Sequence, residues 1–282
     1  MQEKGFWELL QQNNREMTKS GRIVAEYLQH HAEQAQYLSM AALAKACGVA
    51  EATVFRFCRA LGFNGYNEMK IALAKANVTP GAPQPNRLEA GMTTAMLCDY
   101  ALSVANEAIQ NTRALLDPDK IDQAATMLQR ARQVYCFGQG GNMALAEDVW
   151  GRFATISNKF RIVTDDHMQI ITASLLGPED VILFFSYSGA TRDMVDTLQV
   201  AKQYGAKVIL FTHYADSPGA ALSDIVLLCG EQESPLDTGS IPVKIAILMV
   251  ADVLILRYSL DNQELTAISQ QRTSEALAVK LL

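Results

Sequence analysis

The second half of the chain alternates short apolar runs with longer stretches of helical periodicity. Five runs have the length and composition of buried strands, at 134–137 (VYCF), 160–163 (FRIV), 181–185 (VILFF), 207–211 (KVILF) and 225–228 (IVLL). Strands that alternate with helices are joined by right-handed crossovers and form a parallel sheet with helices on both faces. The pattern therefore predicts an α/β domain with a five-stranded parallel sheet flanked by helices.

The first part of the chain lacks this alternation, and its apolar residues recur at helical spacing. Between the two parts, the stretch VTPGAPQPN contains three prolines and one glycine, a composition that cannot continue a helix and has little apolar surface to bury. We predict an all-α domain at 1–77, a Pro-rich linker at 78–90 and the α/β domain at 91–282. The last of these opens with a long helix at about 93–116.

Charge and cysteine content narrow the class of protein. The net charge is −6, but residues 1–77 carry nine Lys and Arg against seven Asp and Glu, which gives +2 and leaves −8 for the rest. An anion-binding module attached to an acidic body fits this asymmetry. The five cysteines include no C-x-x-C pair, so reduced thiols are expected, with no metal ion or cofactor. A redox-sensing Cys58 is an alternative.

No apolar stretch is long enough for a membrane span. The best candidate, 245–256, has twelve residues and contains Asp252. The first residues also lack the charge order and the apolar core of a secretory signal. We expect a cytoplasmic protein without a membrane partner.

A helix-turn-helix pattern occupies residues 38–61, LSMAALAKACGVAEATVFRFCRAL. Ser39 can cap the first helix, Gly48 supplies the turn, and the second helix begins near Glu51. On the second helix, one face is apolar and directed to the core, through Val54, Phe57, Cys58 and Leu61.

The opposite side of this second helix suits contact with DNA. It carries Ala52, Arg56 and Arg59, with Thr53 and Phe55 on its flanks. Arginine can bind guanine edges or phosphates, and small neighbours permit close approach to a major groove. The alternative is an ordinary helical hairpin with solvated arginines, because such patterns give false positives.

A group of hydroxyl side chains follows the third apolar run, in residues 184–193, FFSYSGATRD. Ser186, Ser188 and Thr191 surround Gly189 where a strand passes into a helix. Backbone N–H groups and the macrodipole at a helix N-terminus favour a phosphate, and glycine permits close backbone approach. The sequence predicts a phosphate cradle here; the alternative is a Ser/Thr cap of an ordinary helix.

A second glycine-rich loop, GQGGN at 138–142, follows the first strand. In an open parallel sheet both loops lie at the carboxyl edge, where ligands bind. The pair resembles the sugar isomerase (SIS) fold over roughly 121–260, whose domains bind phosphosugars. The run GVAEATVFRFCRALGFNGYNEMK resembles the N-terminal domain of the RpiR-type bacterial transcriptional regulators, over about 18–76.

The tandem order of the two domains is also that of the RpiR-type family. The resemblance implies that Lys70 joins the DNA-binding set of Ala52, Thr53, Phe55, Arg56 and Arg59. It also implies a ligand-binding set of Gly141, Asn142, Ser186, Ser188, Gly189 and Thr191, with His167 and Ser240 as further candidates. Two residues depart from the family: Ala50 replaces a capping serine, and Asn142 replaces a serine in the first loop.

From this resemblance we expect a transcriptional regulator that binds a double-stranded DNA operator. The effector would be a phosphorylated sugar or sugar acid, bound in the SIS domain. One small helix-turn-helix makes few contacts, so a homodimer or a tetramer is expected on a pseudo-palindromic operator.

Three other functions are weaker interpretations. A phosphosugar isomerase or lyase needs a general base, for which His213 and Glu233 are candidates, and it leaves the helix-turn-helix unexplained. Dinucleotide binding would use the G-x-G start of the first loop and Asp165, but Met143 stands at the third glycine position. A serine hydrolase is disfavoured because Ser186, instead of glycine, precedes Ser188 by two positions.

Overall fold

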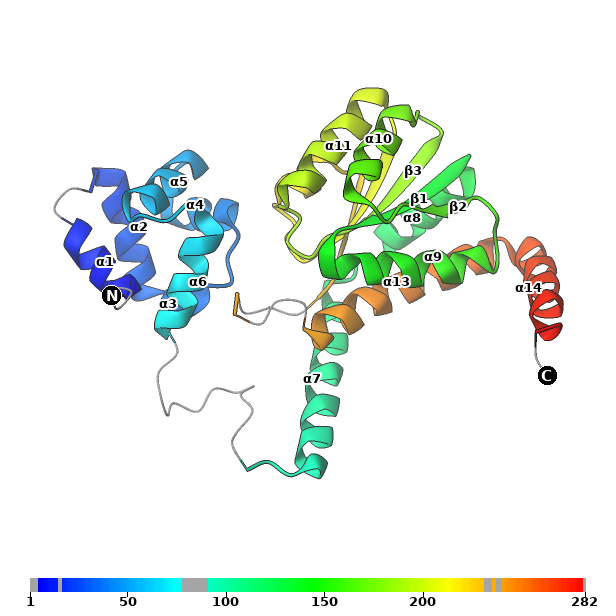
Figure 1. Ribbon diagram of the computed structural model, residues 1–282, viewed down its shortest axis with the longest axis horizontal. Coiled ribbons are helices and arrows are strands. Elements are labelled where there is room, and N and C mark those ends of the chain that lie inside the picture. Colours follow the sequence, from blue (N-terminus) through cyan, green and yellow to red (C-terminus); the bar gives the residue numbers. More distant parts are fainter. Residues whose placement is uncertain (1–4, 15–16, 78–90, 231–234, 237–239, 281–282) are drawn as a thin grey trace. The chain divides into compact units, whose positions relative to one another are not determined.

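The computed structural model describes residues 5–14, 17–77, 91–230, 235–236 and 240–280. They form two compact units, and each is described by itself (Figure 1). The chain divides between Leu97 and Cys98, and residues 235–236 and Ser240 are grouped with the first unit. The predicted linker at 78–90 lies outside the described residues, so the domain boundaries remain a prediction.

The N-terminal unit is entirely helical in its described residues, as expected. Its helices are α1 (Phe6–Asn13), α2 (Lys19–His30), α3 (Ala32–Ala35), α4 (Met40–Cys47), α5 (Glu51–Ala60) and α6 (Tyr66–Asn77). The Oγ of Ser39 accepts a hydrogen bond from the Ala42 N–H at 3.0 Å and so caps α4. Gly48 ends α4 with a φ of 64°, a left-handed conformation that favours glycine. These features confirm the predicted helix-turn-helix of α4 and α5.

The C-terminal unit contains the five predicted strands. They are β1 (Gln133–Gly138), β2 (Phe160–Ile162), β3 (Asp180–Phe185), β4 (Lys207–Thr212) and β5 (Ile225–Leu228). All pairings are parallel, and the order is β2-β1-β3-β4-β5. The helices are α7 (Thr94–Leu115), α8 (Pro118–Arg130), α9 (Met143–Ala154), α10 (Asp166–Leu175), α11 (Arg192–Tyr204), α12 (Pro218–Leu222), α13 (Ile241–Asp261) and α14 (Gln263–Ala278), with a 3-10 turn, η1 (Gly140–Asn142).

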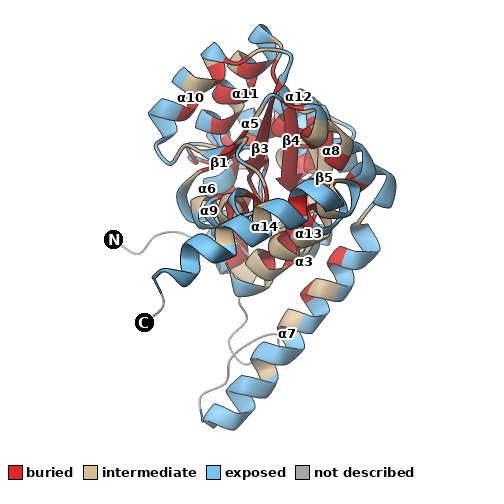
Figure 2. Ribbon diagram, turned by 90° about the vertical axis from the view of Figure 1, so that its right-hand side faces the viewer, coloured by how far each residue is buried: buried red, intermediate tan, exposed pale blue. Residues whose placement is uncertain are grey.

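Alternate residues of the strands feed two hydrophobic cores, one on each face of the sheet. On one face, Cys136 and Leu183 pack with α8, α9 and α13. On the other, Phe137 and Phe184 pack with α10, α11 and α12. The strands are almost wholly buried between these layers (Figure 2). Burial on both faces explains why the strands read as continuous apolar runs.

Long helix α7 is mostly exposed and buries only Ala108 and Thr112 (Figure 2). The Gly230 N–H, just beyond β5, donates a hydrogen bond to the Thr112 Oγ1 at 3.3 Å. None of the described helices combines the length and apolar content that a bilayer span requires.

Candidate functional site

Helix α5 presents the face that the sequence predicts for DNA contact. Its core side is buried, with Val54 and Cys58 fully inaccessible. Ala52, Phe55, Arg56 and Arg59 are exposed, and Thr53 is half-buried on the flank. Phe55 keeps 45% of its surface exposed, so its ring is accessible on this face beside the arginines.

The two arginines of this face are held by neutral neighbours. The Arg56 Nη2 donates to the Thr53 Oγ1 at 3.3 Å, and the Arg59 Nη1 donates to the Asn64 Oδ1 at 3.2 Å. Among the described residues, neither arginine forms an ion pair. Their positive charges are therefore available to an anionic partner.

The start of α5 lacks a side-chain cap, as the alanine at position 50 predicts. Ala50 has the extended backbone of an N-cap residue but offers no acceptor to the first N–H groups. Cys58 on the same helix is fully buried, and burial raises the pKa of its thiol to about 12. Since reactive cysteines need an accessible thiolate, this environment disfavours a redox role.

Lys70 is less accessible than the arginines. It lies on α6, half-buried, with its Nζ 5.8 Å from the centre of the Tyr66 ring. Burial lowers the pKa of its ammonium group to about 8. Lys70 still carries a charge at neutral pH, and its contact with DNA remains a prediction.

The hydroxyl-rich loop after β3 exposes two of its three serine and threonine residues. Ser188 and Thr191 are exposed and Ser186 is buried beneath them. Helix α11 begins at Arg192, as predicted, and the side chain of Thr191 makes no capping hydrogen bond at its start. The interpretation as an ordinary Ser/Thr cap at Thr191 therefore loses its support, because that hydroxyl is not used by the helix.

Gly189 packs this loop closely against the end of β4 and the start of α12. Its φ is 58°, and its carbonyl accepts a hydrogen bond from the Gly219 N–H at 2.8 Å. A Cβ here would lie 2.7 Å from the Ser217 Cβ and 2.9 Å from the Thr212 Oγ1, with the Ser217 hydroxyl closer still. Only glycine fits both the backbone conformation and the space.

The loop after β1 lies beside the first, because β1 and β3 are neighbours in the sheet. Strand order 2-1-3-4-5 places the topological switch point between these two strands, where ligands of open α/β sheets bind. Gly141 is exposed and Asn142 is half-buried in η1, and Asn142 makes no side-chain cap for α9. Their contact with a ligand remains a prediction.

The two remaining ligand candidates lie at helix starts. His167 is exposed in the first turn of α10, which Asp165 caps through the Met168 N–H. Ser240 is half-buried and immediately precedes α13. Asp165, which a dinucleotide site would use for a ribose, is thus already engaged by the helix.

Sequence reasoning overlooked a pair of glutamines at the same edge. Gln169 on α10 is fully buried, and its Nε2 donates to the carbonyls of Gly138 at 2.8 Å and Val163 at 2.9 Å. Its Oε1 has no partner, and both carboxamide atoms of Gln139 are buried without one. The only signal in the sequence is the position of Gln139 inside the glycine-rich loop.

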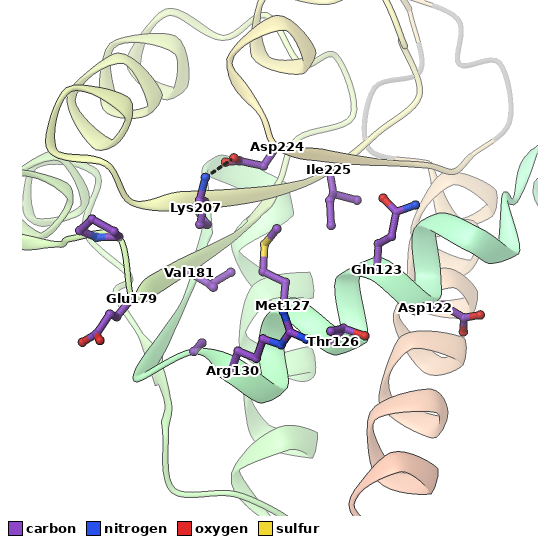
Figure 3. A pocket seen from close by; sticks show the side chains of 12 residues that line it. Asp122, Gln123, Thr126, Met127, Arg130, Glu179, Val181, Lys207, Asp224 and Ile225 are labelled. Atoms are coloured by element: carbon purple, nitrogen blue, oxygen red, sulfur yellow. Dashed lines mark hydrogen bonds and ion pairs between the residues drawn. The ribbon is translucent and has the colours of Figure 1, made fainter.

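A cavity lined by described residues lies at the other edge of the sheet (Figure 3). It measures about 650 Å³ and is bordered by α8 and the amino ends of β3, β4 and β5. Its charges are largely paired: the Lys207 Nζ lies 2.9 Å from the Asp224 Oδ1, and Asp122 pairs with Arg257 at 3.0 Å. A second cavity, of about 320 Å³, lies beside Tyr258 and α14, and neither cavity includes a residue of the two loops.

Of the two residues nominated for isomerase or lyase chemistry, His213 lies within the described residues. The ring of His213 stacks on that of Tyr187, with centres 5.3 Å apart and an interplanar angle of 13°. Glu233 lies outside the described residues. Met143 starts α9 and packs against the core, which fits its predicted conflict with a dinucleotide fingerprint.

Comparisons with known proteins agree with this two-part organisation. Residues 4–79 match the model of the helix-turn-helix domain of the rpiR family, and residues 127–257 match the SIS domain. The transcriptional regulator HexR of Pseudomonas aeruginosa is 32% identical over 89% of this chain and 88% of its own length. The regulator RpiR of Escherichia coli K12 is 27% identical over 91% of this chain and 87% of its own.

Among solved structures, the Vibrio vulnificus NanR protein complexed with ManNAc-6P superimposes with a TM-score of 0.89. It is 25% identical in sequence, and the match covers 98% of this chain and 99% of that one.

Proposed function

Because the chain belongs to the RpiR-type family of helix-turn-helix transcriptional regulators, we propose that a phosphorylated sugar or sugar acid controls its binding to a DNA operator. The effector occupies the carboxyl edge of the sheet, between the loops after β1 and β3. The operator is bound by α5, and two or more copies of the chain bind together.

The observation that carries the ligand half of this proposal is the loop at 186–191. It presents exposed hydroxyls of Ser188 and Thr191 before α11; Thr191 makes no capping hydrogen bond, and the Ser188 Oγ accepts a hydrogen bond from the Ala190 N–H at 3.3 Å. A phosphate gains the helix macrodipole together with these donors, at the switch point of the sheet. The likeness to NanR, whose structure contains a sugar phosphate, supports the same ligand class.

The DNA half rests on α5. Its exposed face carries two arginines without carboxylate partners, the exposed ring of Phe55, and the small side chain of Ala52. Such a face suits a major groove, where arginine reads guanine or neutralises phosphate. Because one helix reads few base pairs, two copies of the chain on a pseudo-palindromic operator supply the selectivity.

A chain of contacts connects the ligand loop with α7. The Tyr187 carbonyl accepts hydrogen bonds from the Thr212 Oγ1 at 2.9 Å and from the His213 N–H at 3.0 Å. The Tyr187 ring approaches Gly230, where an added Cβ would lie 3.4 Å from it, and the Gly230 N–H bonds to Thr112 of α7. A ligand that reshapes the loop thereby changes the support of α7, which leads in sequence to the helix-turn-helix.

The test of the proposed function is a reciprocal pair of variants. Ser188→Ala should abolish the thermal stabilisation by phosphosugars, which is about 2.7 kcal/mol at a hundredfold excess over Kd, while operator binding persists. Arg56→Ala and Arg59→Ala should instead weaken operator binding and its salt dependence, while thermal stabilisation by the ligand persists.

Thermal shift against sugar phosphates and sugar acid phosphates measures the first effect, and fluorescence anisotropy with operator DNA measures the second. The absence of any stabilisation of the wild type would refute the ligand half. Unchanged operator affinity and salt dependence in both arginine variants would refute the DNA half.

A further inference from the structure

The carboxyl edge of the sheet contains polar atoms that the protein does not satisfy. Among the described residues, Gln139 alone leaves both side-chain atoms, Nε2 and Oε1, buried and without a hydrogen-bond partner. A buried carboxamide without partners is costly, because it has lost its hydrogen bonds to water and gained none. Native proteins keep such groups mainly where something else supplies the partner.

The position of Gln139 directs its side chain to one face of the sheet. Its backbone is extended, with φ −131° and ψ 146°, so it continues the alternation of β1. Phe137, two residues earlier, belongs to the core under α10 and α11, and Tyr135, four residues earlier, packs against it. Gln139 therefore faces the side on which α11 begins after the loop at 186–191.

Gln169 adds a fixed acceptor on this same side. Its Nε2 is held by two backbone carbonyls, of Gly138 and Val163, so the carboxamide cannot turn freely. Its Oε1 is buried and unpartnered. If Gln139 donated to this Oε1, the Oε1 of Gln139 would still lack a donor, so the pair always needs one from elsewhere.

We propose that Gln139, supported by Gln169, is a specificity-determining residue that hydrogen-bonds hydroxyl groups of the sugar part of the effector. The inference rests on the proposed function and deepens it, because it assigns the phosphate to the loop at 186–191 and the sugar to the glutamines. A hydroxyl both donates and accepts, so it satisfies the surplus acceptor as well as the amide donor. A bare phosphate gains nothing from this contact.

The experiment compares Gln139→Met with the matched variant Gln133→Met. Methionine has nearly the same shape without the hydrogen-bonding atoms, and Gln133 also has a buried, unpartnered Oε1, at the opposite end of the same strand. Calorimetric titration with inorganic phosphate, glucose 6-phosphate, N-acetylmannosamine 6-phosphate and 6-phosphogluconate gives affinities for each variant. Thermal unfolding without ligand reports on folding.

Gln139→Met should weaken the binding of the tightest sugar phosphate about tenfold or more, since a site built for a hydroxyl rejects a poorer match. It should leave phosphate affinity within about twofold and thermal stability unchanged or raised. Gln133→Met should change neither affinity. Ser188→Ala should weaken the binding of phosphate and of sugar phosphate to a similar extent.

Two results would overturn the inference. In the first, the wild type binds the probes and Ser188→Ala weakens their binding, but Gln139→Met leaves the ratio of sugar phosphate affinity to phosphate affinity unchanged. The proposed function then stands, and the role of Gln139 fails. If the wild type binds none of the probes, the ligand half of the proposed function fails and the inference fails with it.

Discussion

The two edges of the parallel sheet differ in how their polar groups are satisfied. At the amino edge, charged side chains pair with each other: Arg132 binds the fully buried Asp180 through two hydrogen bonds, of 3.1 and 2.7 Å, and Lys207 binds Asp224. At the carboxyl edge, the loops carry hydroxyls and carboxamides, several of them without partners.

This difference distinguishes charged groups that the fold pairs from polar groups that it leaves unpaired. The larger of the two cavities lies at the amino edge, but its charges are mostly engaged with one another, so its size alone says little about a ligand. Unpartnered carboxamide atoms occur at both edges, with the Oε1 of Gln133 at the amino edge, and Gln139 and the Oε1 of Gln169 at the carboxyl edge. Among them, Gln139 alone leaves both of its side-chain atoms without a partner.

The largest effect is expected at the amino edge, from Arg132→Met. It leaves the buried Asp180 carboxylate without its cation, which should lower the free energy of unfolding. Urea denaturation measures this loss. Ligand affinity, normalised to the folded fraction, should not change.

The pH dependence of the same pair gives a control. Burial raises the pKa of Asp180, but the hydrogen bond from Arg132 and the Gly177 N–H outweigh it, so the net pKa is lowered. The stabilisation is present above the ordinary Asp pKa and is lost as pH falls through the lowered one. The difference in free energy of unfolding between the wild type and Arg132→Met should therefore become smaller in acid. Adding Asp180→Asn to Arg132→Met should recover most of the lost stability. A gap independent of pH would contradict this account.

Gly189→Ala should have the next largest effect, at the carboxyl edge. The left-handed backbone costs about 1–2 kcal/mol for alanine, and contacts with Ser217 and Thr212 add about 1–3 kcal/mol. Gly140→Ala is the matched control, because Gly140 also has a positive φ, of 53°, but no atom lies within 4 Å of its added Cβ. Chemical denaturation should show a smaller loss for Gly140→Ala; equal losses would mean that crowding at Gly189 is unimportant.

The smallest effect is expected from Lys207→Met. Both partners of this ion pair are partly exposed, with side-chain accessibilities of 47% and 32%, so its removal should cost less than about 1 kcal/mol. Asp224 keeps its hydrogen bond from the Val208 N–H. Ligand-induced thermal stabilisation should equal that of the wild type, and a loss of it would move the binding site toward the amino edge.

The sequence predicted the strands well because burial on both faces makes the central ones, such as β3, continuous apolar runs. It also predicted the division of α5 into a buried and an exposed face, since helical spacing determines both. The loop at 186–191 was recognisable because hydroxyls and glycine follow a strand directly.

Tertiary contacts were beyond the reach of sequence patterns. The contact of Lys70 with Tyr66, four residues earlier on α6, follows from helical spacing, but the burial that lowers the pKa of its ammonium group does not. Likewise, the burial of Gln139 and Gln169 depends on the approach of α10 to the end of β1, across 31 residues between Gln169 and Gly138. A buried side chain without a hydrogen-bond partner can be recognised only in the three-dimensional structure.

Because most of α7 is exposed, a small rotation about its buried contact moves its far end by a larger distance. The buried contact at Thr112 lies near the C-terminal end of the helix. The helix from Thr112 back to Thr94 is about 27 Å long at 1.5 Å per residue. A tilt of about 5° about Thr112 displaces the N-terminal end of α7 by about 2 Å. A small rotation about this one contact is therefore enough to displace the first turn of α7 by an appreciable distance.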